Sequence, residues 1–98
     1  MMFEIRITPE AIEDIHQFRK YDQQKIIEGI ENQLTHEPTQ ETRNRKKLRP
    51  NEIAEWELRI GDFRVFYDIN QESQLVKIEA VGYKTGSQLF IHGEEYQL

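Results

Sequence analysis

Residues 56–67 read WELRIGDFRVFY, and this stretch decides the fold. Apolar and polar side chains alternate on both sides of Gly61-Asp62, which predicts two half-buried strands joined by a two-residue turn. Three apolar pairs then share one face, which we predict to be the core: Ile60 with Phe63, Leu58 with Val65, and Trp56 with Tyr67.

The opposite face of this hairpin is charged. The same register places Arg59 directly opposite Arg64 and Glu57 opposite Phe66. Two like charges facing each other in a sheet cost up to about 1 kcal/mol. An anion bound between the arginines offsets this cost, and a surface ladder in which Glu57 and Asp68 neutralise the arginines is the alternative. The pattern alone leaves both open.

The chain before the hairpin predicts a strand and two helices. Residues 3–7 alternate as a strand, and Thr8-Pro9 then supplies an N-cap and a proline at the first helical position. Asp22 is the expected cap of a second helix, which Pro38 ends by about residue 36. The apolar positions recur at helical spacing: Ala11, Ile12, Ile15 and Phe18 in the first helix, and Ile26, Ile27, Ile30 and Leu34 in the second.

The rest of the chain predicts loops and one more strand. Residues 37–51 form a polar, basic loop, residues 75–81 form a strand that ends at Gly82, and residues 85–98 form a polar tail. The order is β-α-α-β-β-β. We therefore predict an α+β fold with two N-terminal helices packed on one face of an antiparallel sheet.

The composition bounds the class of protein. The 98 residues are 37% hydrophobic and 32% charged, with ten aromatics, which predicts one domain over residues 1–98. No apolar run approaches the ~20 residues that span a bilayer, no signal peptide is visible, and there is no cysteine. Three scattered histidines lack metal-ligand spacing. We expect a cytoplasmic protein without a metal, a cofactor or a membrane partner.

The charge is concentrated in one segment. The net charge is −5, yet residues 43–49, RNRKKLR, hold five basic and no acidic residues. This segment is either a contact for a polyanion or a solvated loop. Lys46, Lys47 and Arg49 enter the hairpin from it, and together with the arginine pair they could form an anion site. Strict alternation places Lys84 on the core face, so it joins this site only if the chain bends at Gly82.

Three stretches together resemble the RelE/ParE superfamily of type II toxins: residues 47–49 (KLR), residues 56–67, and residues 81–84 (VGYK). The β-α-α-β-β-β order is similar as well. RelE-like toxins cut mRNA in the ribosomal A site without a metal, whereas ParE-like toxins inhibit DNA gyrase. The resemblance implies a cognate antitoxin, ribosome and mRNA as partners, and operator DNA only through the antitoxin complex.

The resemblance also implies roles for particular residues. Arg64 matches the arginine that contacts the scissile phosphate, and Lys84 matches the basic residue after the last strand. Phe90 stands where a tail tyrosine is usual, and Glu55 and Glu57 stand where lysines are usual.

The chemistry of RNA cleavage assigns the remaining candidates. Arg59 and Arg64 suit stabilisation of a pentacoordinate phosphate, because guanidinium donates bidentately. Glu57 is the candidate base, and Lys84, Lys47 or His92 is the candidate acid. The candidate ribosome contacts are Arg43, Arg45, Lys46 and Arg49. Cleavage of ribosome-bound mRNA is the favoured function. Gyrase inhibition and an inactive, antitoxin-binding toxin fold are the alternatives.

Overall fold

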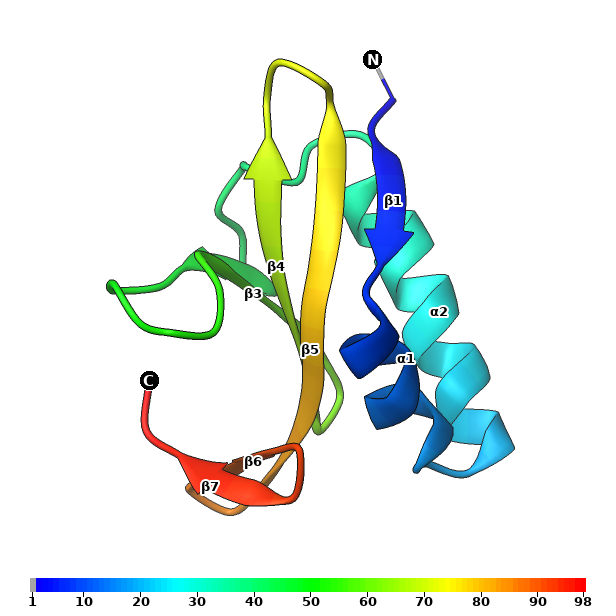
Figure 1. Cartoon of the computed structure of the whole chain (residues 1–98), viewed down its shortest axis with the longest axis vertical. Coiled ribbons are helices and arrows are strands. Elements are labelled where there is room, and N and C mark those ends of the chain that lie inside the picture. The colour runs from blue at the N-terminus through cyan, green and yellow to red at the C-terminus, as the bar shows by residue number, and fades with distance from the viewer. Residues whose placement is uncertain (1) are drawn as a thin grey trace.

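The computed structural model describes residues 2–98 and has the predicted α+β architecture, with further short strands (Figure 1). The elements are β1 (Glu4–Ile7), α1 (Pro9–His16), α2 (Lys20–Leu34), β2 (Arg45–Lys47), β3 (Trp56–Ile60), β4 (Phe63–Asn70), β5 (Leu75–Thr85), β6 (Gln88–Ile91) and β7 (Glu94–Tyr96).

Of the two predicted helix N-caps, one is confirmed and the other is wrong. The Ala11 N–H donates to Thr8 Oγ1 at 3.1 Å, so Thr8 caps α1 as predicted. The predicted cap of α2 at Asp22 is wrong, because the N-cap is Arg19, three residues earlier, and α2 begins at Lys20. The Asp22 carboxylate instead accepts a hydrogen bond from Arg19 Nε at 3.2 Å.

The strands form one sheet in the order β2-β3-β4-β5-β6-β7. All neighbours on this path are antiparallel, and β1 joins the sheet by pairing in parallel with residues 75–78 of β5. Since β4 runs along one edge of β5, β1 and β6 share the other edge, where β6 pairs with residues 83–85. The sheet therefore differs from the predicted antiparallel sheet in one respect, which is the parallel pairing of β1 with β5.

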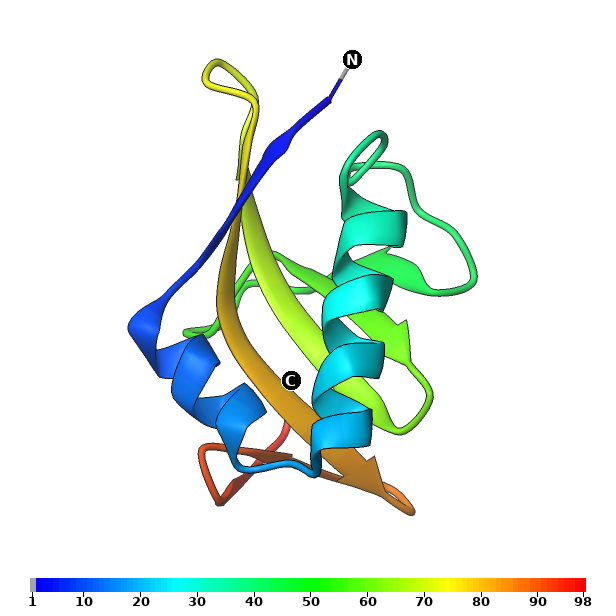
Figure 2. The same cartoon turned by 90° about the vertical axis from the view of Figure 1, so that its right-hand side faces the viewer.

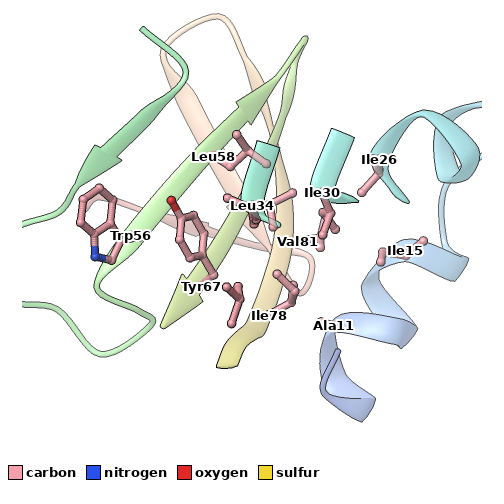
Figure 3. Close-up of a cluster of buried hydrophobic side chains, with 12 residues drawn as sticks. Ala11, Ile15, Ile26, Ile30, Leu34, Trp56, Leu58, Tyr67, Ile78 and Val81 are labelled. Atoms are coloured by element: carbon pink, nitrogen blue, oxygen red, sulfur yellow. The ribbon is translucent and has the colours of Figure 1, made fainter. Parts of the chain in front are cut away.

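The hairpin has the predicted register, with Leu58 opposite Val65 and Arg59 opposite Arg64. Both helices lie on the same face of the sheet, as Figure 2 shows. The main core lies between the helices and this face, and Figure 3 shows its side chains pointing toward one another. Its buried members are Ala11, Ile15, Ile26, Ile30, Leu34, Trp56, Leu58, Val65, Tyr67, Val76, Ile78 and Val81.

The C-terminal part departs from the predicted loop and tail. The loop over residues 37–51 contains β2, and residues 85–98 contain β6 and β7 instead of an irregular tail. The last predicted strand does not end at Gly82 but continues to Thr85. The missing side chain of Gly82 allows β6 to lie close to β5 here, because a Cβ at this position would lie 2.3 Å from the Phe90 carbonyl oxygen of β6.

A second, smaller apolar cluster lies on the sheet face opposite the helices. We call it the open-face cluster. Its buried members are Ala54, Phe66, Ala80, Leu89 and Ile91, and Leu48, Ile53, Tyr96 and Leu98 pack against it. The cluster therefore joins the loop before β3, the centre of the sheet and the C-terminal strands. No helix in residues 2–98 is long and apolar enough to cross a membrane.

Candidate anion-binding site

The arginine pair lies at the tip of the hairpin, on the face opposite the helices. Arg64 is only 7% exposed, whereas Arg59 is exposed. The Arg64 Nη1 donates to the carbonyls of Gly61 (2.8 Å) and Phe63 (2.9 Å), which holds the guanidinium at the turn. Burial, and secondly the neighbouring Arg59, lower the pKa of Arg64, and Glu57 and Asp62 partly oppose this. The two cations are thus close enough to repel each other.

The two acids that could neutralise these arginines have other partners. Glu57 lies 3.9 Å from Lys46 Nζ, and Asp68 accepts the Glu55 backbone N–H at 2.8 Å. In the described part of the chain neither Arg59 nor Arg64 forms an ion pair. The structure therefore lacks the proposed surface ladder, and it leaves a cationic pair without a carboxylate partner at contact distance.

Glu57 is the carboxylate nearest to this pair by register, because it lies two residues before Arg59 on the same face of β3. Its side chain is 12% exposed, so it is held in a partly dry environment. Lys46 lies directly opposite Glu57 in the β2–β3 ladder, whereas Lys47 lies opposite Trp56. Trp56 belongs to the helix-side core, so Lys47 lies on the wrong face for the predicted site, and Lys46 takes its place.

Lys84 reaches the open face, though not by the predicted bend at Gly82. The β4–β5 register shifts between Phe66 and Tyr67, and Glu79 is the extra residue on β5. This bulge moves Ala80 onto the open face and Val81 into the helix-side core. Lys84 then lies on the Ala80 side, and its N–H donates to the Asp62 carbonyl of the hairpin turn at 2.8 Å.

The basic segment divides into exposed residues and one structural residue. Arg43, Lys46 and Arg49 are exposed. Arg45 is half-buried, and its guanidinium donates to the Gln33 carbonyl of α2 and to the Gln40 carbonyl at 3.0 Å. Arg45 therefore ties the loop after α2 to the helix, which is a role that a count of charges does not predict.

Tyr83 of β5 and Phe90 of β6 form an aromatic stack on the helix side of the sheet, where Tyr83 also contacts Phe18, whereas the neighbouring Lys84 lies on the open face. The rings of Tyr83 and Phe90 stack with centroids 5.3 Å apart, and Tyr83 is 36% exposed. Phe90 stands where the resemblance implies a tyrosine, so this position has no group that exchanges protons.

His92 contacts Asp14, a residue outside the predicted candidates. The Nδ1 of His92 lies 2.7 Å from Asp14 Oδ1, and Asp14 Oδ2 accepts the Val81 N–H at 3.0 Å. Asp14 is only 4% exposed, and it fills the gap between β1 and β6 on the edge of β5. The sequence did carry one indication of this role: Asp14 lies at helical spacing from the apolar Ala11 and next to Ile15, so it falls on the face of α1 that is predicted to be buried.

The arrangement suits binding of a phosphate and acid–base chemistry. On the open face, Glu57 lies 3.9 Å from Lys46 Nζ and shares the hairpin face with Arg59 and Arg64, and Lys84 lies on the same face of β5 beyond Gly82. Within residues 2–98, no group of three or more histidine, aspartate or glutamate side chains could hold a metal ion.

Comparison with known proteins agrees with this fold. A family model described as the ParE toxin of the type II toxin–antitoxin system parDE matches residues 5–85. A chain in the toxin–antitoxin complex RelBE2 from Mycobacterium tuberculosis superposes with a TM-score of 0.72 and 26% identity, over 86% of this chain and 100% of that chain. A chain in the archaeal RelE–RelB complex from Pyrococcus horikoshii OT3 gives a TM-score of 0.60 and 22% identity, over 80% and 90%. No curated protein sequence matches this chain.

Two helices on one face of a mostly antiparallel sheet define the class as the RelE/ParE superfamily of toxins. Since the family model covers residues 5–85, the chain belongs to the ParE toxin family and is a toxin of a type II toxin–antitoxin system.

Proposed function

We propose that this toxin is an endoribonuclease that cleaves mRNA on the ribosome without a metal. One observation carries the proposal: a mostly buried carboxylate, Glu57, lies on the same sheet face as Lys46, Arg59, Arg64 and Lys84. A phosphodiester brings negative charge to this face and offers its 2′-hydroxyl proton to a base.

The reaction follows from these positions. Glu57 takes the proton from the 2′-hydroxyl while the 2′-oxygen forms a bond to phosphorus. Arg59 and Arg64 donate to the phosphoryl oxygens, on which charge develops. The bond from phosphorus to the 5′-oxygen breaks, and Lys84 protonates the leaving oxygen. The products are a 2′,3′-cyclic phosphate and a free 5′-hydroxyl. His92 is the alternative acid, whereas Lys47 lies on the opposite side of the sheet.

The test uses 70S ribosomes stalled with a defined codon in the A site. Primer extension reports any new mRNA 5′ end. We expect a ribosome-dependent cut that Glu57→Gln slows by about 10²–10⁴-fold, because the amide cannot accept the proton. Arg64→Lys, which keeps the charge but loses the fork of donors, is expected to slow the cut as well. Lys25→Ala, which changes an exposed lysine of α2 on the other side of the sheet, is the matched control and should leave the rate unchanged. Absence of any cut at micromolar protein contradicts the proposal.

We also propose that residues 43–49 contact ribosomal RNA and that a cognate antitoxin holds the toxin inactive. The RelBE2 and RelE–RelB structures are toxin–antitoxin complexes, which supports the second point. Contact of the complex with operator DNA is expected through the antitoxin. Alanine at Lys46 should weaken ribosome binding and reduce its salt dependence. Alanine at Arg45 should destabilise the fold first, because its guanidinium holds the loop.

A second candidate function is inhibition of DNA gyrase by binding. Two points favour it: the matching family model describes ParE toxins, and Phe90 stands where the RelE-like resemblance implies a proton-exchanging tyrosine. A supercoiling assay with purified gyrase tests it. Inhibition that survives Glu57→Gln, together with absence of mRNA cleavage, would favour this function over the first.

A further inference from the structure

A pocket that the proposed cleavage does not use lies at the tip of the hairpin, on the helix side of the sheet. Its volume is about 470 Å³. Three segments build it: the connection from α1 to α2, the β3–β4 turn and the end of β5, which lie together at the lower end of the molecule (Figure 2). Aromatic side chains line it at Phe18, Phe63 and Tyr83, with a few polar groups around them. This composition is typical of a site for a small flat ligand.

The aromatic rings of this pocket form a connected series. Phe18 packs edge-on against Phe63, with ring centroids 4.8 Å apart, and against Tyr83 at 6.1 Å. Tyr83 also stacks on Phe90 at 5.3 Å, so its ring contacts two other rings. It is nevertheless 36% exposed. A flat ligand therefore packs on this ring at a small cost in side-chain entropy, because the ring is already held in place.

The pocket rim carries a carboxylate without a cationic partner. Asp62 lines the pocket, is exposed, and forms no ion pair within residues 2–98. An ionised carboxylate accepts hydrogen bonds and donates none. Among the RNA bases, guanine carries adjacent donors, the ring N–H and the exocyclic amine, on its Watson–Crick edge. A guanine that enters this pocket matches both oxygens of the carboxylate.

The pocket adjoins the candidate anion-binding site through the hairpin turn. The Arg64 guanidinium donates to the carbonyls of the residues on either side of Asp62. Lys84 lines the pocket, and its N–H donates to the Asp62 carbonyl at 2.8 Å. In the β4–β5 ladder, the pair of Phe63 with Tyr83 is next to the pair that contains Arg64. Each nucleotide of an unpaired RNA strand carries a phosphate and a base, so a strand that crosses this turn meets the cations on one side and the rings on the other.

We propose that a base next to the scissile phosphate passes around the hairpin tip and stacks on Tyr83, and that Asp62 makes guanine the preferred base. Stacking holds any base, because every base has a π-face, whereas the carboxylate distinguishes the bases by their edges. The inference rests on the proposed RNA substrate. It adds two specificity-determining residues outside the group that carries out the cleavage.

The first experiment is an NMR titration of the toxin with the four nucleoside 5′-monophosphates, which requires neither ribosomes nor cleavage. We expect the ring signals of Phe18, Phe63 and Tyr83 to shift, and GMP to bind at least threefold more tightly than AMP, CMP or UMP. Equal responses to all four nucleotides, or shifts confined to Arg59 and Arg64, overturn the inference, because only the phosphate is then recognised. Pocket signals that respond to a co-purified antitoxin but to no nucleotide overturn it in favour of a protein segment.

The second experiment repeats this titration with variants. Tyr83→Leu keeps an apolar side chain but removes the ring, and should weaken GMP binding about fivefold or more. Tyr21→Leu, at an exposed tyrosine of α2, is the matched control and should bind GMP as the parent does. Asp62→Asn replaces one acceptor by a donor without disturbing the packed rings, and asparagine suits a hairpin turn. It should bind all four nucleotides equally. A retained preference for GMP in Asp62→Asn overturns the inference, as does parental affinity in Tyr83→Leu.

The third experiment compares stalled ribosomes whose A-site codons place guanine or adenine beside the cut. We expect the parent to cut the guanine codon at least threefold faster, and Asp62→Asn to cut both at equal rates. Equal rates with the parent overturn the inference. Absence of any cut, together with GMP binding in the pocket, contradicts the proposed function and supports the pocket, so the two failures are distinguishable.

Discussion

The two faces of the sheet are built from the same strands but are covered in different ways. Helices α1 and α2 cover one face over a large continuous core (Figure 3). The other face is covered by the loop before β3 and by the C-terminal strands, over the smaller open-face cluster. This partial cover leaves room beside the hairpin tip for charged groups. The helix face therefore contributes most of the apolar burial, whereas the open face has less apolar burial and carries the charged candidate site.

The largest expected effect is a loss of stability when a leucine of the helix-side core is truncated, compared with the same change in the open-face cluster. Leu58 is fully buried in the helix-side core, and Leu58→Ala should destabilise the protein by about 3–5 kcal/mol, measured by chemical denaturation. Leu89→Ala, in the open-face cluster, is the matched change and should cost about 2 kcal/mol, because the short C-terminal strands can relax around the cavity. Equal costs would show that both clusters act as one core.

A smaller effect is expected where β6 crosses Gly82. An added Cβ meets the Phe90 carbonyl oxygen at 2.3 Å and Ile91 Cγ1 at 2.9 Å, so Gly82→Ala must displace β6. We expect a loss of about 1–3 kcal/mol. NMR shifts should change in residues 88–96 and stay constant in α1 and α2. Changes spread evenly over both faces would contradict the independence of the open face.

The Asp14–His92 pair connects the two faces, and its loss should have a moderate effect. Asp14→Asn keeps an acceptor for the Val81 N–H but weakens the bond to His92, so we expect a loss of about 1 kcal/mol. Asp14→Ala should cost more, because the Val81 N–H is then unpaired in a buried position. Denaturation of both variants checks the order. A larger loss in Asp14→Asn would indicate that the charge, not the acceptor, matters most.

The smallest expected effect is a pH dependence on the open face. Burial, and then a hydrogen bond with Asp68, raise the pKa of Glu79 above its ordinary value of 4.5. The folded protein therefore holds this proton more tightly than the unfolded chain, so its contribution to stability falls as pH rises from about 4.5 through the raised pKa. Glu79→Gln removes this dependence and should gain relative stability as pH rises. Denaturation curves from pH 4 to 8 measure the difference, and a constant difference would contradict it.

The sequence was most informative where residues act through local periodicity. The Gly61-Asp62 turn and the alternation around it were sufficient to predict every pair of the β3–β4 ladder, including Arg59 with Arg64. The Thr8 cap is likewise local. By contrast, residues 85–98 are polar and lack a strong period, and they form strands only because β5 offers them an edge.

The candidate site shows the same division. Arg59, Arg64 and Glu57 could be placed on one face because they share a predicted hairpin. Lys46 and Lys47 could not be told apart, because the register of β2 depends on contacts with β3 that no local pattern encodes. The face on which Lys84 lies depends on a bulge at Glu79, because one extra residue moves each later side chain of β5 to the opposite face of the sheet.

The sequence by itself determined the two helices, the hairpin register and most of the helix-side core, because these follow from short-range alternation, turn and cap residues. The resemblance of its motifs indicated the superfamily. Only the tertiary structure decided which cations meet Glu57, which edge of β5 each strand takes, and that Asp14 is buried against Val81 and His92. Those outcomes depend on bulges, shared edges and side chains that meet across 67 or 78 residues of chain, where local preference has no influence.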